Sequence, residues 1–288
     1  MIFDLCTDIH QSGRSVKRLA LCLASRRLGA LYLALMVACC CVPHVFAQSV
    51  CLPAPRLLTT FPMGGQVGTT VEVSITADNA ENLEELSFSH PGLTSAPVLD
   101  DNGLPIANKY LVTIAEDCPV GIHEARVMTR LGISSSRVFC VGDQPEVQCL
   151  GKNTTVATAM PLDLNSICNA AMTKQSVDHF LFAATKGQRV VVDCAAQGVD
   201  SKLNPVLIVA DASGNDLVVE RRGGAIDFVA PADGSYVVKV HDLTFNGGPN
   251  YFYRLAIQAA STDENVARLP ATRAVSSFSW PPVGLALQ

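Results

Sequence analysis

The chain has 288 residues, a net charge of −5 at pH 7 and a hydrophobic fraction of 49%, which is typical of a folded protein with two modest domains. Without the five basic and two acidic residues of positions 1–47, 16 basic and 24 acidic side chains remain, a net charge of −8. A surface of that sign repels a phosphate backbone, so we expect no nucleic-acid partner.

Residues 1–47 have the pattern of a secretory signal peptide. Basic residues precede the apolar stretch LGALYLALMVACCCV at 28–42, and Val45 and Ala47 suit cleavage after Ala47. The apolar run is shorter than the roughly 20 residues that span a bilayer. We therefore expect an exported protein, extracellular, periplasmic or on the cell surface, with no membrane span after cleavage. The alternative is lipidation at Cys39, because MVAC loosely resembles a lipobox.

Residues 57–143 contain a succession of predicted β-strands. In TTVEVSIT, Val71, Val73 and Ile75 alternate with polar residues, which indicates a half-buried strand. The segments LSFSH, KYLVTIA, HEARVMT and SSRVFCV follow, separated by turns rich in glycine, proline and aspartate. No stretch has apolar residues at helical spacing for three turns, so we predict a β-sandwich.

Residues 150–258 predict a second all-β domain. Its strands are expected at DHFLFAA, QRVVVDCAA, PVLIVAD, DLVVE, AIDFVA, SYVVKVHDL and YFYRLAI. Glycine-containing turns connect them, which favours a sandwich of the jelly-roll kind. Residues 259–288 contain three prolines and no hairpin pattern, so we predict an irregular tail or linker. The predicted fold class is all-β, with two consecutive β-sandwiches after a signal peptide.

Six cysteines remain after the signal segment, an even number that predicts up to three disulfides in an exported chain. Of the 15 possible pairings, the order of the predicted strands favours Cys51–Cys149, Cys118–Cys140 and Cys168–Cys194, and the alternative is that three or more of these cysteines are free buried thiols. None of the six forms a CxxC motif, so we expect no metal site among them.

The second domain resembles the bacterial pre-peptidase C-terminal domain family. The resemblance covers about 100 residues and rests on an aspartate-aromatic start, a KGQ turn, an NP.L strand leading to D..G, and an AP.DG.Y hairpin. The matching residues are Asp178, Phe180, Lys186, Gly187, Gln188, Asn204, Pro205, Leu207, Asp211, Gly214, Pro231, Asp233, Gly234 and Tyr236. The resemblance implies a non-catalytic module of the kind appended to secreted peptidases, supposed to aid substrate contact, secretion or folding.

The first domain resembles immunoglobulin-like domains that open with P.GG..GT and close with P.G.H and G.S....F.V. The matching residues are Pro62, Gly64, Gly65, Gly68, Thr69, Pro119, Gly121, His123, Gly132, Ser134, Phe139 and Val141. The resemblance implies a sandwich of immunoglobulin type at residues 57–143.

One departure from the pre-peptidase pattern affects the expected cofactor. Related sandwiches in secreted collagenases bind calcium through acidic clusters, but Arg221 and Arg222 occupy positions where carboxylates would be expected. Residues Asp211 to Asp216 resemble the start of a calcium loop, yet no glutamate follows near the twelfth place, which favours a β-turn. We predict no cofactor, and calcium is doubtful.

The segment HDLTFNGGPNYFYRLAI at 241–257 places a histidine beside an aspartate. Because neighbours on a strand point to opposite faces, a catalytic pair of His241 and Asp242 is not expected. We predict a hairpin with a half-exposed histidine, in which Asp242 caps the turn through its backbone amides.

The strand after this hairpin is predicted to present different residues on its two faces. Tyr251 and Tyr253 are expected on the inward face, continued by Leu255 and Ile257. Arg254 is expected on the opposite face with Phe252, where its guanidinium pairs with a carboxylate such as Asp227.

No motif for hydrolysis is found, so we predict no catalytic residues. There is no GxSxG elbow and no HExxH, and the hydroxyls of Gly132 to Ser136 have no base nearby in the sequence. We predict a non-enzymatic exported binding or accessory module that contacts protein or polysaccharide. The alternatives are an accessory part of a secreted peptidase whose catalytic domain lies elsewhere, and a structural module of the cell envelope.

Overall fold

The computed structural model describes residues 53–80, 83–149 and 151–260, and it is all β except for two short 3-10 helices, Val156–Thr158 and Gln197–Val199. The predicted signal peptide and most of the predicted tail lie outside the described residues, although the last strand extends to Ala260, two residues into that tail. Within the described residues no helix is long and apolar enough to cross a membrane.

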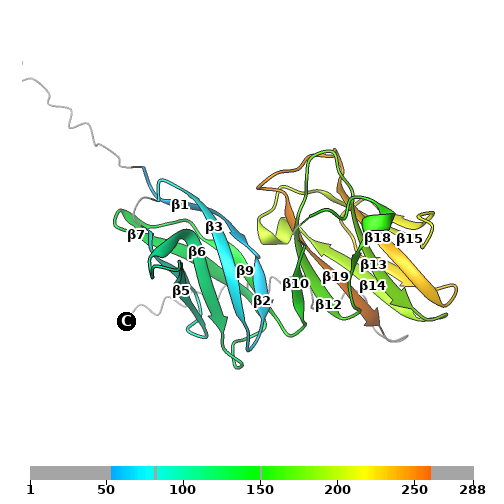
Figure 1. The fold of residues 1–288 in the computed structure, drawn as a ribbon, viewed down its shortest axis with the longest axis horizontal. Coiled ribbons are helices and arrows are strands. Elements are labelled where there is room, and N and C mark those ends of the chain that lie inside the picture. The colour runs from blue at the N-terminus through cyan, green and yellow to red at the C-terminus, as the bar shows by residue number, and fades with distance from the viewer. Residues whose placement is uncertain (1–52, 81–82, 150, 261–288) are drawn as a thin grey trace, which may run out of the picture. The chain divides into compact units, whose positions relative to one another are not determined.

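Residues 56–142 form two sheets (Figure 1). Their strands are β1 (Arg56–Phe61), β2 (Gly64–Gln66), β3 (Thr70–Asp78), β4 (Leu83–Phe88), β5 (Leu93–Leu99), β6 (Pro105–Ile114), β7 (Gly121–Thr129), β8 (Gly132–Ile133) and β9 (Arg137–Gly142). One sheet has the order β1-β3-β6-β5; the other has β2-β9-β7-β4, with β8 beside β7. The alternation predicted for β3 is confirmed, because Val73 and Ile75 are buried in the shared core with Val127 and Phe139.

Residues 146–260 form two further sheets. Their strands are β10 (Glu146–Gln148), β11 (Met160–Pro161), β12 (Ser166–Ala171), β13 (Asp178–Ala184), β14 (Arg189–Ala195), β15 (Pro205–Asp211), β16 (Asp216–Glu220), β17 (Ile226–Val229), β18 (Gly234–Asp242) and β19 (Phe252–Ala260). The sheet orders are β10-β12-β19-β14-β17 and β11-β13-β18-β15-β16. Phe180 and Phe182 of β13 pack in one core with Tyr253 and Leu255 of β19.

The two-faced pattern predicted for the last strand is confirmed. Tyr253, Leu255 and Ile257 enter the core between these two sheets. Phe252 belongs instead to a small separate cluster with Met63 and Val199.

Candidate ligand-binding site

The segment that begins at His241 is not the predicted hairpin. It is a loop that connects the two sheets, because β18 pairs with β13 and β15 whereas β19 pairs with β12 and β14. The imidazole Nδ1 of His241 lies 2.8 Å from the backbone oxygen of Asp242, and the ring stacks on Phe245 with centroids 4.5 Å apart. The ring's described contacts include no nucleophile, so His241 is not part of a Ser-His-Asp constellation among the described residues.

Asp242 organises this loop, and the predicted capping role is confirmed. Its carboxylate accepts backbone N–H groups of Asn204, Thr244 and Asn246 at 2.9, 3.0 and 3.1 Å. The Thr244 hydroxyl donates to the same carboxylate at 2.7 Å. Burial raises the pKa of Asp242, but these hydrogen bonds lower it by more, so its pKa lies below 3.8.

The glycine pair in the loop has a steric cause. A Cβ on Gly247 would collide with backbone atoms of Met172, Thr173 and Lys174, so only glycine permits this close approach. Gly248 follows with φ +127° and donates its N–H to the Met172 carbonyl at 2.9 Å. The loop is therefore fixed against the end of β12.

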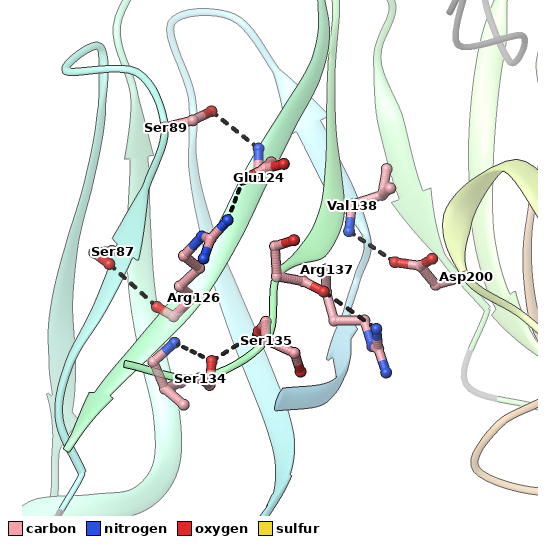
Figure 2. A network of polar contacts seen from close by, with 11 residues as sticks. Ser87, Ser89, Glu124, Arg126, Ser134, Ser135, Arg137, Val138 and Asp200 are labelled. Carbon is pink, nitrogen blue, oxygen red and sulfur yellow. Dashed lines mark hydrogen bonds and ion pairs between the residues drawn. The ribbon is translucent and has the colours of Figure 1, made fainter. Parts of the chain in front are cut away.

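The hydroxyls near Ser134 are structural (Figure 2). The Ser134 Oγ accepts the backbone N–H of Val127 at 3.0 Å and donates to the Ser135 carbonyl at 2.8 Å. Ser134 is buried, and neither bond involves a general base. Figure 2 also shows Asp200, whose carboxylate accepts the backbone N–H of Val138 at 3.0 Å.

The predicted partner of Arg254 is wrong. Arg254 donates to Glu146 Oε1 at 2.6 Å and to the Cys140 carbonyl at 3.3 Å, with only 1% of its side chain exposed. Asp227 instead pairs with Arg189 at 2.8 Å on the edge of the same sheet. Sequence reasoning missed Glu146 because β10 lies between the two predicted domains, 57–143 and 150–258.

Asp211 closes a turn, as the β-turn interpretation predicts. Its carboxylate accepts backbone N–H groups of Ser213 and Asn215 at 2.8 and 2.9 Å and the Asn215 side-chain amide at 2.9 Å. No group of three or more His, Cys, Asp or Glu side chains within the described residues is arranged to hold a metal ion.

The five described cysteines are thiols, and the expected pairs are not adjacent. Cys118 lies in the core between the first two sheets, and Phe139 and Val141 of β9 face the same core. Cys140, which lies between them in β9, faces the opposite side. The predicted Cys118–Cys140 pair is therefore wrong. Cys51 lies outside the described residues, so its predicted partnership with Cys149 stays a prediction.

The predicted Cys168–Cys194 pair is also wrong. Both residues align with Leu255, Cys168 from β12 and Cys194 from β14, so β19 lies between them. Cys149 is the actual neighbour of Cys168. A hydrogen bond from the Cys168 thiol lowers the pKa of Cys149 to about 7, and the same bond, together with burial, raises the pKa of Cys168.

Sequence reasoning also missed a group around Cys118. Its Sγ lies 3.9 Å from His90 Nδ1 and 4.0 Å from His123 Nε2. Both nitrogens are engaged elsewhere, because His90 Nδ1 accepts the Gly92 N–H at 3.0 Å and His123 Nε2 lies 2.8 Å from the Pro119 carbonyl. Burial raises the pKa of the Cys118 thiol, so it is not an activated nucleophile.

A pocket of about 400 Å³ lies at the ends of β14 and β15, beside the β16–β17 turn. It is lined by Asp193, Cys194, Ala195, Ala196, Gln197, Gly198, Asn204, Pro205, Arg221, Arg222, Gly223 and Leu243. None of these residues was singled out as a ligand contact in the sequence. The two arginines were noted only because they replace expected carboxylates.

Two of the pocket's walls are held by hydrogen bonds. Asn204 is fixed by Asp242, which accepts its backbone N–H, and by Leu243, which donates its N–H to the Asn204 carbonyl at 2.8 Å. The Gln197 side-chain amide donates to Asn204 Oδ1 at 2.9 Å. The loop beginning at His241 therefore supports the pocket through Asp242.

The arginines of the pocket come from the turn between β16 and β17. Glu220 Oε1 accepts the backbone N–H of Arg222 at 2.5 Å, and Gly223 turns the chain with φ +73°. Arg221 and Arg222 are exposed, and no ion pair within the described residues engages either guanidinium. The carboxylate of Asp193 also lines the pocket and accepts the Cys194 N–H at 2.9 Å.

Comparisons with known proteins give only distant likenesses. No family model matches the chain, and no curated protein matches it. A periplasmic inhibitor of g-type lysozyme from Aeromonas hydrophila is 16% identical with a TM-score of 0.29, covering 35% of this chain and 97% of that chain. The pre-peptidase C-terminal domain of a Bacillus anthracis collagenase is 14% identical with a TM-score of 0.29, covering 41% of this chain and 100% of that chain.

A third similar structure is a glucan-utilisation protein, SGBP-B of Bacteroides ovatus, solved with a mixed-linkage heptasaccharide. It is 9% identical with a TM-score of 0.24, covering 68% of this chain and 74% of that chain. The chain thus has distant structural similarity to the pre-peptidase C-terminal domain and other bacterial β-sandwich modules. Values this low assign neither a family nor a ligand to it.

Proposed function

We propose that this chain is a non-enzymatic exported binding module, and that the pocket beside the β16–β17 turn is its ligand site. The observation that supports the proposal is a concave site whose walls are already hydrogen-bonded in place, with Asn204 fixed by Asp242 and Gln197. Pre-formed pockets of roughly 300–1,000 Å³ with a few placed polar groups are the usual form of small-ligand sites. The ligand is a polysaccharide or protein segment outside the cytoplasm.

The test is to block the pocket and measure binding. A Cβ on Gly198 meets nothing within 4 Å, so Gly198→Trp adds bulk at the pocket wall without a backbone clash. We expect the purified protein to bind members of a panel of saccharides and peptides, and the variant to lose that binding while keeping its circular dichroism spectrum. Binding that the variant retains in full would place the ligand elsewhere and refute the assignment of the site.

We also propose that β1–β9 form an immunoglobulin-like domain and β10–β19 a jelly-roll domain. The support is that each set of strands has its own hydrophobic cluster, and that no strand of one set joins a sheet of the other. Limited proteolysis of the full chain is expected to cut first near residues 143–151. A first cut inside β13 or β18 would contradict these boundaries.

The absence of hydrolase activity is a further part of the proposal. Purified protein is expected to show no turnover of casein or peptide substrates, because Ser134 and His241 both bond to backbone groups rather than to each other or to a catalytic partner. Turnover that survives purification and is lost in Ser134→Ala or His241→Ala would overturn it.

A further inference from the structure

We propose that the pocket binds an acidic saccharide, with Arg221 and Arg222 holding its carboxylate or sulfate group; this rests on the function proposed above. The inference concerns the chemical class of the ligand. It follows from the charges, amides and apolar groups that line the pocket, and from the side chains that the lining lacks.

The pocket has an excess of positive charge in an acidic protein. Arg221 and Arg222 line it against a single lining carboxylate, Asp193, whereas the whole chain has a net charge of −5. The nearby carboxylate of Glu220 accepts the Arg222 backbone N–H and so secures the turn. Guanidinium groups bind carboxylates and other oxyanions through paired N–H donors. Two arginines at a concave site that form no ion pair within the described residues therefore favour an anion.

The polar groups beside the arginines suit hydroxyl groups. One N–H of the Gln197 amide is donated to Asn204 Oδ1, which leaves the Gln197 carbonyl as an acceptor and the Asn204 amide as a donor. A sugar hydroxyl both donates and accepts, so it can satisfy both groups. An acidic peptide would bring a side-chain carboxylate but fewer hydroxyl groups for these amides.

The lining also argues against a neutral glucan. None of the twelve lining residues is aromatic, so no ring is present on which a neutral sugar could stack. The apolar part of the lining consists of small groups, namely Ala195, Ala196, Pro205 and Leu243. Affinity must therefore come mainly from charged and polar contacts, which favours an acidic sugar.

The experiment measures binding by isothermal titration calorimetry to three probes of matched length. These are an oligogalacturonate, its carboxyl-reduced neutral counterpart, and a sulfated oligosaccharide; a tri-glutamate peptide represents the protein class. We expect binding of at least one acidic saccharide, weaker binding at higher salt, and at least tenfold weaker or undetectable binding of the neutral counterpart. Preference between the carboxylated and sulfated probes identifies the anion.

Variants link the binding to the two arginines. Arg221→Gln and Arg222→Gln are each expected to weaken binding of the acidic saccharide by roughly tenfold or more. Arg130→Gln is the matched control, because Arg130 is also an exposed arginine in a turn but does not line the pocket. It is expected to leave the affinity unchanged.

The outcomes separate this inference from the proposed function. Binding of the neutral saccharide or the peptide alone, lost in Gly198→Trp but not in the arginine variants, would overturn the inference and leave the binding function standing. No binding of any of these probes would overturn the inference, whereas the binding function is decided by the wider panel and the Gly198→Trp variant. An effect of Arg130→Gln equal to that of the pocket variants would reduce the interaction to non-specific charge attraction and also refute the inference.

Discussion

Arg254 shows how one buried charge makes a partner indispensable. Its guanidinium is almost fully buried, pairs with Glu146 at 2.6 Å, and has an Nε without a hydrogen-bond partner within the described residues. Glu146 is also held by the Asn169 amide at 2.7 Å, so the pair joins β10, β12 and β19. Removing one member of such a pair leaves an uncompensated charge in a site that excludes water.

Glu146→Gln is therefore expected to destabilise the protein by about 3–5 kcal/mol, measured as the free energy of unfolding in urea. Glu72→Gln is the matched control, because Glu72 pairs with Lys109 at 2.6 Å while both side chains are more than 40% exposed. Its effect is expected to stay below about 1 kcal/mol. Equal effects of the two substitutions would show that Arg254 does not depend on Glu146 for charge compensation.

Gly247 illustrates a residue fixed by close packing of backbones. Gly247→Ala is expected to destabilise the protein by about 1–3 kcal/mol, because the added methyl group would displace the backbone of residues 172–174. Gly198→Ala is the control: it meets open space and is expected to change stability by less than about 0.5 kcal/mol. Thermal unfolding of both variants tests this, and an unchanged Gly247→Ala would mean that the loop moves freely away from β12.

At the scale of elements, the loop between β18 and β19 is stabilised by an ionised carboxylate. The pKa of Asp242 is depressed, so its stabilising contribution is present above the ordinary value of 3.8 and is lost as the pH falls through the lower, folded-state pKa. Protonation removes acceptor capacity needed by three backbone amides and one hydroxyl. The hydrogen bonds that hold the loop and the one that holds Asn204 in the pocket wall should therefore be lost together.

Asp242→Asn is expected to lower stability at neutral pH and to reduce the loss of stability between about pH 6 and pH 2, measured as urea midpoints across that range. Asp101→Asn, at an exposed aspartate in the β5–β6 turn, serves as the control. If the Asp242 variant loses stability with acid as steeply as the parent chain, the carboxylate does not contribute to the acid sensitivity.

Several elements could be predicted from the sequence because their local pattern and their tertiary environment agree. The strands β13, β15 and β16 coincide with the predicted segments DHFLFAA, PVLIVAD and DLVVE. Strand β12, SICNAA, was missed because it is buried on both faces while containing polar residues, so it shows no alternation. The side-chain amide of its Asn169 donates to Glu146, a residue 23 positions away that no local pattern reveals.

The pocket could not be predicted for a related reason. Its lining comes from four separate segments, and none of them has a motif by itself. The replacement of expected carboxylates by Arg221 and Arg222 was visible in the sequence, but only the fold places them beside Gln197 and Asn204. The predicted cysteine pairs were wrong for the same reason. Which cysteines lie close together depends on the order of the strands and on the face of each strand that carries the cysteine, rather than on position along the chain.

At the scale of the whole molecule, export can be tested directly. The intact mass of the protein from its native host is expected to match residues 48–288, because the predicted cleavage follows Ala47. Alkylation before and after reduction, on unfolded protein, counts the cysteines held in disulfides. A heavier species would indicate retention of the leader or lipidation at Cys39, and it would refute cleavage after Ala47.

The position of β19 between Cys168 and Cys194 has a consequence for the order of events during maturation. A disulfide requires Cα atoms within about 7 Å, whereas strands on either side of a central strand are about 9.5 Å apart. A bridge formed between these cysteines in the unfolded chain would leave no room for β19, the last strand described. In an oxidising compartment, a bond between these two thiols that forms before β19 inserts would trap the chain in a misfolded, crosslinked state.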